Sequence, residues 1–156
     1  GMLRSAAMMQ DDVETIAAAT DMLAEAKLTP ELRNEALYFR AKAYLNQQAD
    51  KKAMNDLQAL AKDTRTLYGA EAKYLVALQL YKAHEYAAAE KEILNFIEQS
   101  TPHAYWLARS FILLSDVYVS MDKKLDARQY LLSLQQNYHA DDDIEQMINE
   151  RLEKLK

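Results

Sequence analysis

The three histidines are the first residues whose type could do chemistry, as metal ligands or as general bases. His84, His103 and His139 lie far apart in the sequence, and none belongs to an HExxH pattern that would put two imidazoles on one helix face. We interpret them as solvated residues of turns or helix starts. The chain has no cysteine, which excludes thiolate metal sites, disulfides and cysteine nucleophiles.

Serine and carboxylate residues form no catalytic pattern either. The chain has two glycines, too few for a GxSxG nucleophile turn or for a glycine-rich loop that cradles phosphate. The run from Asp141 to Asp143 could attract a cation. We favour another role for it, because negative charge at the start of a helix offsets the helix dipole. The sequence therefore predicts no enzyme, no cofactor and no metal site.

Composition and charge narrow the classes of partner and location. The net charge is −5, whereas a protein that binds nucleic acid through phosphates is normally basic, so we predict no nucleic-acid partner. No apolar run approaches the roughly 20 residues that cross a bilayer, so we predict no direct membrane insertion. Gly1 before Met2 is typical of a tag-removal scar. We recognise no targeting signal in this sequence, so we leave the location undecided between the cytoplasm and the periplasm or cell envelope.

The elements that would position any site are helices. Apolar residues recur at steps of three and four, as Leu37, Ala41, Tyr44 and Leu45 do, and sustained alternation is missing. We predict an all-α protein of about nine helices with short connections, so that neighbours pack antiparallel. The predicted helices span 2–9, 12–27, 31–46, 50–63, 67–83, 86–99, 102–121, 123–137 and 142–155.

Breaks in the pattern predict where helices begin. Threonine followed by proline is typical of an N-cap and the first helical turn, and an aspartate before a helix can cap it as well. The predicted N-caps are Asp11 (with Glu14 as a capping box), Thr29, Asp50, Thr101 and Asp122.

Small residues repeat in phase along the chain. Ala18, Ala53, Ala89 and Ala127 are separated by 35, 36 and 38 residues. Twelve residues before each stands a second small residue: Ala6, Ala41, Ala77 and Ser115. A large residue follows each of these small residues. Three residues after the Ala6 set stand Met9, Tyr44, Leu80 and Tyr118, and four residues after the Ala18 set stand Met22, Leu57, Ile93 and Leu131. Two helices approach closely where small side chains face each other, so the spacing indicates repeated helix pairs that stack to bury their remaining apolar faces.

This pattern resembles the tetratricopeptide repeat, a pair of antiparallel helices with small residues at these positions. The resemblance implies a right-handed superhelical solenoid forming a single domain over 1–156, with units at about 2–31, 32–66, 67–104 and 105–140. The chain departs from the family where Gln48, His84 and Asp122 replace the turn glycine, and the small residue late in the second helix is missing from every unit.

The two ends of the array differ. The first unit begins mid-helix, so we interpret the chain as a C-terminal fragment of a longer bacterial repeat protein. The helix at 142–155 carries one apolar stripe (Ile144, Met147, Ile148 and Leu152), which is typical of a capping helix that covers the last unit. A weaker similarity to the helical repeats of bacterial outer-membrane assembly lipoproteins, from Tyr105 to Tyr130, is the basis for suggesting the cell envelope.

The resemblance also implies a function. In tetratricopeptide arrays the first helices of the pairs line a concave groove that receives a peptide or helix of a partner protein. The corresponding groove residues here are Tyr38, Lys42, Leu45, Asn46, Tyr74, Leu78, Tyr81, Lys82, Arg109, Ile112, Asp116 and Val119. Three of the four charged ones are basic, which favours a partner segment with acidic groups and apolar anchors. The chaperone-tail carboxylate clamp of some relatives is not expected, because only Arg109 falls at a clamp position.

Two hypotheses follow. The first is a non-enzymatic scaffold that binds a partner protein in this groove. The alternative is a structural end-cap or self-association module of a larger protein. The isolated chain would then be an inert monomer or a weak homo-oligomer, and the groove residues would only pack between units or meet solvent.

Overall fold

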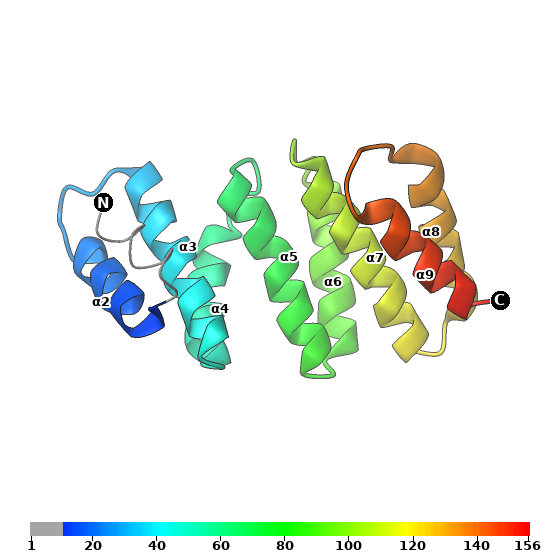
Figure 1. The fold of residues 1–156 in the computed structure, drawn as a ribbon, viewed down its shortest axis with the longest axis horizontal. Helices are drawn as coiled ribbons and strands as arrows, with labels where there is room; N and C mark the ends of the chain where they lie inside the picture. Colours follow the sequence, from blue (N-terminus) through cyan, green and yellow to red (C-terminus); the bar gives the residue numbers. More distant parts are fainter. Residues whose placement is uncertain (1–10) are drawn as a thin grey trace. The chain divides into compact units, whose positions relative to one another are not determined.

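The computed structural model describes residues 11–156, and this part of the chain contains eight helices and no strands. The prediction of an all-α protein is therefore confirmed. The ninth predicted helix, at 2–9, lies outside the described residues together with Ala6 and Met9. The helices are α2 (Asp12–Leu23), α3 (Pro30–Asn46), α4 (Asp50–Leu60), α5 (Leu67–Lys82), α6 (Tyr86–Glu98), α7 (Ala104–Ser120), α8 (Lys124–Asn137) and α9 (Ile144–Lys154) (Figure 1).

The chain divides into two compact units, and the boundary lies inside α5, between Lys73 and Tyr74. In the first unit α2 packs on α3, and α3 packs on α4. In the second unit α6 packs on α7, α7 packs on α8, and α9 contacts both α7 and α8. The turns within these pairs are short, which leaves antiparallel packing as the available arrangement. The four repeat boundaries and the superhelix stay predictions.

Two of the predicted N-cap residues cap the N-termini of their helices as expected. The Asp11 side chain accepts a hydrogen bond from the Glu14 amide at 3.0 Å, and Thr29 accepts one from the Leu32 amide at 3.2 Å. Each bond satisfies one of the free N–H groups of a first turn. Pro30 stands in the first turn of α3, where its missing N–H costs nothing.

The other three predicted N-caps were wrong. The cap position of α4 is Ala49, that of α7 is His103 and that of α8 is Lys123, and none of them makes a side-chain capping bond. Thr101 instead accepts from the His103 amide at 3.2 Å, within a turn that delays α7 by two residues. The predicted end of the second helix, at 27, was also too late. α2 ends at Leu23, after which residues 24–27 are exposed and offer no apolar face to pack.

Three helices end in the same way, at the residues that replace the turn glycine. Gln48, His84 and Asp122 have φ angles of 60°, 62° and 60°, in the left-handed region. After each one, the next amide bonds five residues back, as in Ala49 to Tyr44 at 2.8 Å. The same bonds join Glu85 to Leu80 at 2.9 Å and Lys123 to Tyr118 at 2.7 Å. This is the Schellman motif, which satisfies carbonyls at a helix end and normally has glycine at the left-handed position.

The small residues of the repeat are buried wherever the structure describes them. Ala41, Ala53, Ala89 and Ala127 have no exposed surface, and Ala77 and Ser115 are each 1% exposed. Of the large residues that follow the alanines of the second helices, Leu57, Ile93 and Leu131 are equally buried, whereas Met22 is half-buried. Side chains of this size let the helix axes approach, while their large neighbours fill the space beside them. The spacing thus located core residues in both units.

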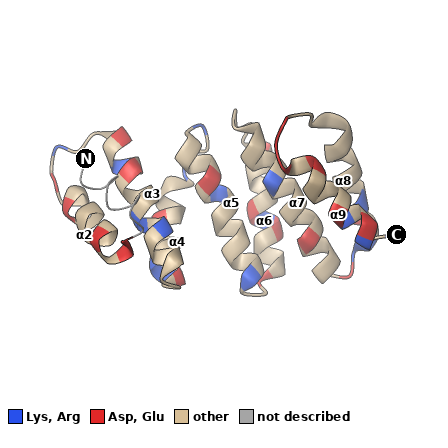
Figure 2. Cartoon of the chain, viewed as in Figure 1, with Lys and Arg blue, Asp and Glu red and all other residues tan. Residues whose placement is uncertain are grey.

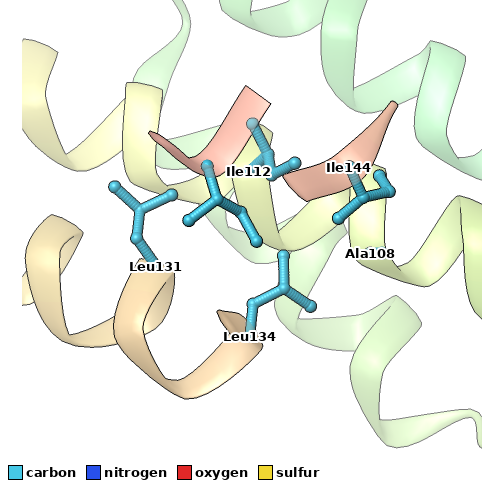
Figure 3. Packing of buried hydrophobic residues seen from close by; sticks show 6 residues of the cluster. Ala108, Ile112, Leu131, Leu134 and Ile144 are labelled. Atoms are coloured by element: carbon cyan, nitrogen blue, oxygen red, sulfur yellow. The ribbon is translucent and has the colours of Figure 1, made fainter. Parts of the chain in front are cut away.

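Helix α9 closes the core of the second unit. Ile144 and Ile148 pack among Ala108 and Ile112 of α7 and Leu131 and Leu134 of α8 (Figure 3). The other two residues of the predicted stripe, Met147 and Leu152, pack around the same cluster. Burial of each isoleucine stabilises the docked helix by about 1.5–3 kcal/mol. Hydrophobic packing therefore holds α9 against α7, the helix that contributes the last predicted groove residues.

Candidate functional site

Three predicted groove residues, Tyr38, Lys42 and Asn46, lie together on α3 in the first unit. They line a pocket of about 190 Å³ with Asp12, Thr15, Phe39 and Ala43. The Asn46 amide donates to Asp12 at 3.3 Å. Among the polar side chains that border the pocket, Asn46 and Asp12 therefore pair with each other, whereas the buried Thr15 hydroxyl has no hydrogen-bond partner within the described residues.

Tyr38 and Lys42 both bind a buried carboxylate, that of Glu71. The side chain of Glu71 is 9% exposed and accepts from the Tyr38 hydroxyl at 3.0 Å and from the Lys42 ammonium at 3.1 Å. The Tyr38 ring also stacks on Tyr68, with centroids 4.3 Å apart. Burial raises the pKa of Tyr38, and the adjacent Glu71 carboxylate raises it further. Because a buried carboxylate needs such partners, Lys42 and Tyr38 hold Glu71 in place, and the charge of Lys42 is neutralised.

Tyr74 and Arg109, in the second unit, hold each other. The Arg109 guanidinium lies 5.0 Å from the centre of the Tyr74 ring, 5.8 Å from that of Tyr105 and 5.7 Å from that of Trp106. It donates to both tyrosine hydroxyls, at 3.1 Å and 2.9 Å. Tyr105 in turn donates to Asp143 at 2.9 Å. Cation–π contacts of this kind fix the side chains they join. With Tyr74 only 6% exposed, this cluster belongs to the packing of the unit.

The remaining predicted groove residues differ in accessibility. Ile112 is 1% exposed and lies in the core beneath α9, so a partner has no access to it while α9 is docked. Asp116 forms a two-pronged ion pair with Arg151 of α9, at 2.9 Å and 3.0 Å. Leu78 and Tyr81 are half-buried, and Lys82 is exposed. Helix α9 therefore occupies part of the surface that was predicted to receive a partner.

A larger pocket lies where α9 leaves this surface open. We call it the α7–α9 pocket; its volume is about 480 Å³. It is lined by Tyr81, Ser115, Asp116, Val119, Ser120, Lys124, Glu150, Arg151, Lys154 and Leu155. The site joins apolar surface, including Val119 at 39% exposure, to charged groups of both signs. Figure 2 shows basic and acidic turns lying together at the C-terminal end of α9.

The charges around the α7–α9 pocket are not equally free. Asp116 and Arg151 neutralise each other, and Glu150 accepts from Gln146 at 3.1 Å. The ammonium groups of Lys124 and Lys154 have neither a hydrogen bond nor an ion pair within residues 11–156, and both side chains are exposed. These two lysines are therefore the cations of the pocket with unused capacity to bind a ligand, and the Glu150 carboxylate, whose amide partner carries no charge, keeps its negative charge.

The sequence prediction reached only part of this pocket. Tyr81, Asp116 and Val119 were predicted as groove residues. The wall formed by α8 and α9 (Lys124, Glu150, Arg151, Lys154 and Leu155) was missed, because a capping helix was expected to cover apolar surface and not to line a site. The apolar stripe of α9 was the available signal, since a helix docked by that stripe must place its flanking residues beside α7.

Residues 11–156 contain no group of three or more His, Asp or Glu side chains that could hold a metal ion. His84 stacks on Tyr86, and a ring nitrogen of His139 lies 2.9 Å from the Gln136 carbonyl. In the same part of the chain, no helix has the length and apolar character needed to cross a membrane.

No protein family, curated protein or solved structure matches the chain.

Proposed function

We propose that this chain is a non-enzymatic protein-binding scaffold of tetratricopeptide type, which holds a peptide or helix of a partner protein. The α7–α9 pocket is the observation that carries the proposal. Pockets that hold small molecules are typically concave and of roughly 300–1,000 Å³, with apolar walls and a few well-placed polar groups, and a pocket of this size can also receive side chains of a partner peptide. The pocket has this size, exposed apolar surface at Val119, and two lysines that are unpaired within residues 11–156.

The proposed binding site keeps Tyr81, Asp116 and Val119 of the predicted groove and leaves out the groove residues that pack inside the two units. Tyr74, Arg109 and Lys42 support the fold through buried contacts, so replacing them would disturb packing as well as any binding. The exposed rim of the α7–α9 pocket is the better surface to test. Tyr81, which lines the pocket, also favours a protein partner, because tyrosine is enriched among the residues that contribute most of the binding energy at protein interfaces.

The test is selection of a displayed random peptide library on the immobilised chain, with two glutamate variants. Val119→Glu puts a charge on the apolar wall of the pocket and should abolish retention of the selected peptides. The matched control is Leu125→Glu, at a position that is 79% exposed on α8 and outside the pocket, and it should retain them. Equal loss in both variants, or no selected peptide at all, would count against the proposal.

A second candidate is self-association, and it has its own observation. Leu125 and Leu132 are 79% and 37% exposed, and their spacing of seven places them on one side of α8. Two copies could bury these leucines against each other. Light scattering separates the candidates: a dimer that Leu125→Glu dissociates and Val119→Glu leaves intact would support self-association.

A further inference from the structure

The positive charge that is free to bind a partner lies in a different place from the one the sequence indicated. Of the predicted groove cations, Lys42 is neutralised by Glu71, and Arg109 is held by tyrosine hydroxyls and aromatic rings. Lys82 is exposed but does not line the α7–α9 pocket. Lys124 and Lys154 do line it, and both are unpaired within the described part of the chain.

The position of Lys124 is not explained by helix stability. It is the first residue of α8, where the helix dipole disfavours a positive charge. Lys154 lies in the last turn of α9, where a positive charge is favourable, so only one of the two lysines has a role within its own helix. A bound anion would stabilise both of them.

The other charges of the pocket leave room for such an anion. Arg151 is used by Asp116, and the rigid two-pronged geometry of that pair fixes α9 against α7 beside the cavity. Three basic and two acidic side chains line the pocket, whereas the whole chain carries a net charge of −5. The pocket is therefore a locally basic site on an acidic protein, and Val119 and Leu155 provide apolar surface next to it.

We propose that the α7–α9 pocket binds a carboxylate of the partner segment between Lys124 and Lys154, with a neighbouring apolar side chain of that segment against Val119 and Leu155. The carboxylate is that of an aspartate, of a glutamate or of a free chain end, which share the same chemistry. This inference rests on the proposed scaffold function and names the chemistry of its partner.

The experiment uses peptides selected from the random library and measures their affinity by fluorescence anisotropy. Each peptide is made in three forms: unchanged, with Asp and Glu replaced by Asn and Gln, and with an amidated C-terminus. The double variant Lys124→Glu/Lys154→Glu is compared with Lys91→Glu/Arg128→Glu, which changes the net charge equally at exposed positions outside the pocket. Long-range charge effects should be similar in the two variants, so a difference between them reports on the pocket itself.

We expect the pocket variant to bind about tenfold more weakly, from two lost exposed ion pairs and the added repulsion, and the control to stay within about twofold. Removing the carboxylate from the peptide should cause a similar loss. The form that loses affinity, amide-substituted or C-terminally amidated, shows which kind of carboxylate binds. The inference is overturned if the carboxylate-free peptides bind unchanged or if both variants weaken binding equally. If no peptide is selected, the scaffold proposal itself fails, which is a distinguishable result.

Discussion

Replacing Gln48 with glycine should stabilise the protein, although the substitution removes a whole side chain. Gln48 has a φ of 60° and an exposed side chain with no hydrogen bond within the described residues. A left-handed backbone costs a non-glycine residue about 1–2 kcal/mol, and glycine avoids this cost. Glycine also gives the unfolded chain more freedom, which offsets part of the gain. We expect a net increase of about 0.5–1 kcal/mol in the free energy of unfolding.

The neighbouring residue supplies a matched control. Gln47 has the same side chain, is also exposed and has a φ of −87°, so glycine there should cost about 0.5–1 kcal/mol. Urea unfolding followed by circular dichroism would measure both variants, and thermal unfolding should show shifts of opposite sign, each of about 1–4 °C. If Gln48→Gly destabilises the protein as much as Gln47→Gly does, the left-handed helix end and the repeat register that predicts it are wrong.

Three further predictions test the packing and the electrostatics. Ala89→Leu should cost about 1–3 kcal/mol of unfolding free energy by overpacking, because Ala89 is fully buried; a neutral result in urea unfolding would contradict the repeat phase. Asp56→Asn should cost about 2–4 kcal/mol by the same assay, because it leaves Arg40 without the buried carboxylate that it contacts at 2.7 and 2.8 Å; a loss below about 1 kcal/mol would contradict this. Burial and the hydrogen bond to Asp142 raise the pKa of Tyr138 to about 12, and Asp142→Asn should lower this pKa while the effect of burial remains. The stability that the raised pKa of Tyr138 contributes is complete below about pH 10 and is lost as the pH rises through about 12. The measurement is an NMR titration of labelled tyrosine rings, and the same Tyr138 pKa in the unchanged chain and in the Asp142→Asn variant would contradict the role of the Asp142 hydrogen bond.

Much of the fold was accessible from the sequence because it depends on local and periodic signals. The burial of Ala53, Ala89 and Ala127 followed from their spacing, since a helix pair needs small residues at its point of closest approach. Asp11 and Thr29 were recognisable as N-caps because a capping bond involves only neighbouring residues.

The errors arose where one residue type suits two backbone positions. Asp122 was predicted to begin a helix, because aspartate is a good N-cap. In the structure it takes the left-handed position that ends the preceding turn, which aspartate also tolerates better than most residues. The family pattern placed a glycine at this position, and that clue identified the geometry better than the capping preference did.

The site was harder to predict than the fold, because it depends on contacts between distant residues. Nothing local reveals that Lys42 pairs with Glu71 or that Arg151 reaches Asp116. Those pairings decide which charges are neutralised and which stay free. The sequence therefore identified basic residues near a groove but not the two lysines with unused binding capacity.

An NMR titration of the labelled chain with a selected peptide shows whether a partner segment binds at the α7–α9 pocket. We expect the largest amide shifts at Val119, Ser120, Lys124 and Lys154. Largest shifts at Leu125 and Leu132, on the outer face of α8, with little change in the pocket, would contradict binding there and favour the self-association surface.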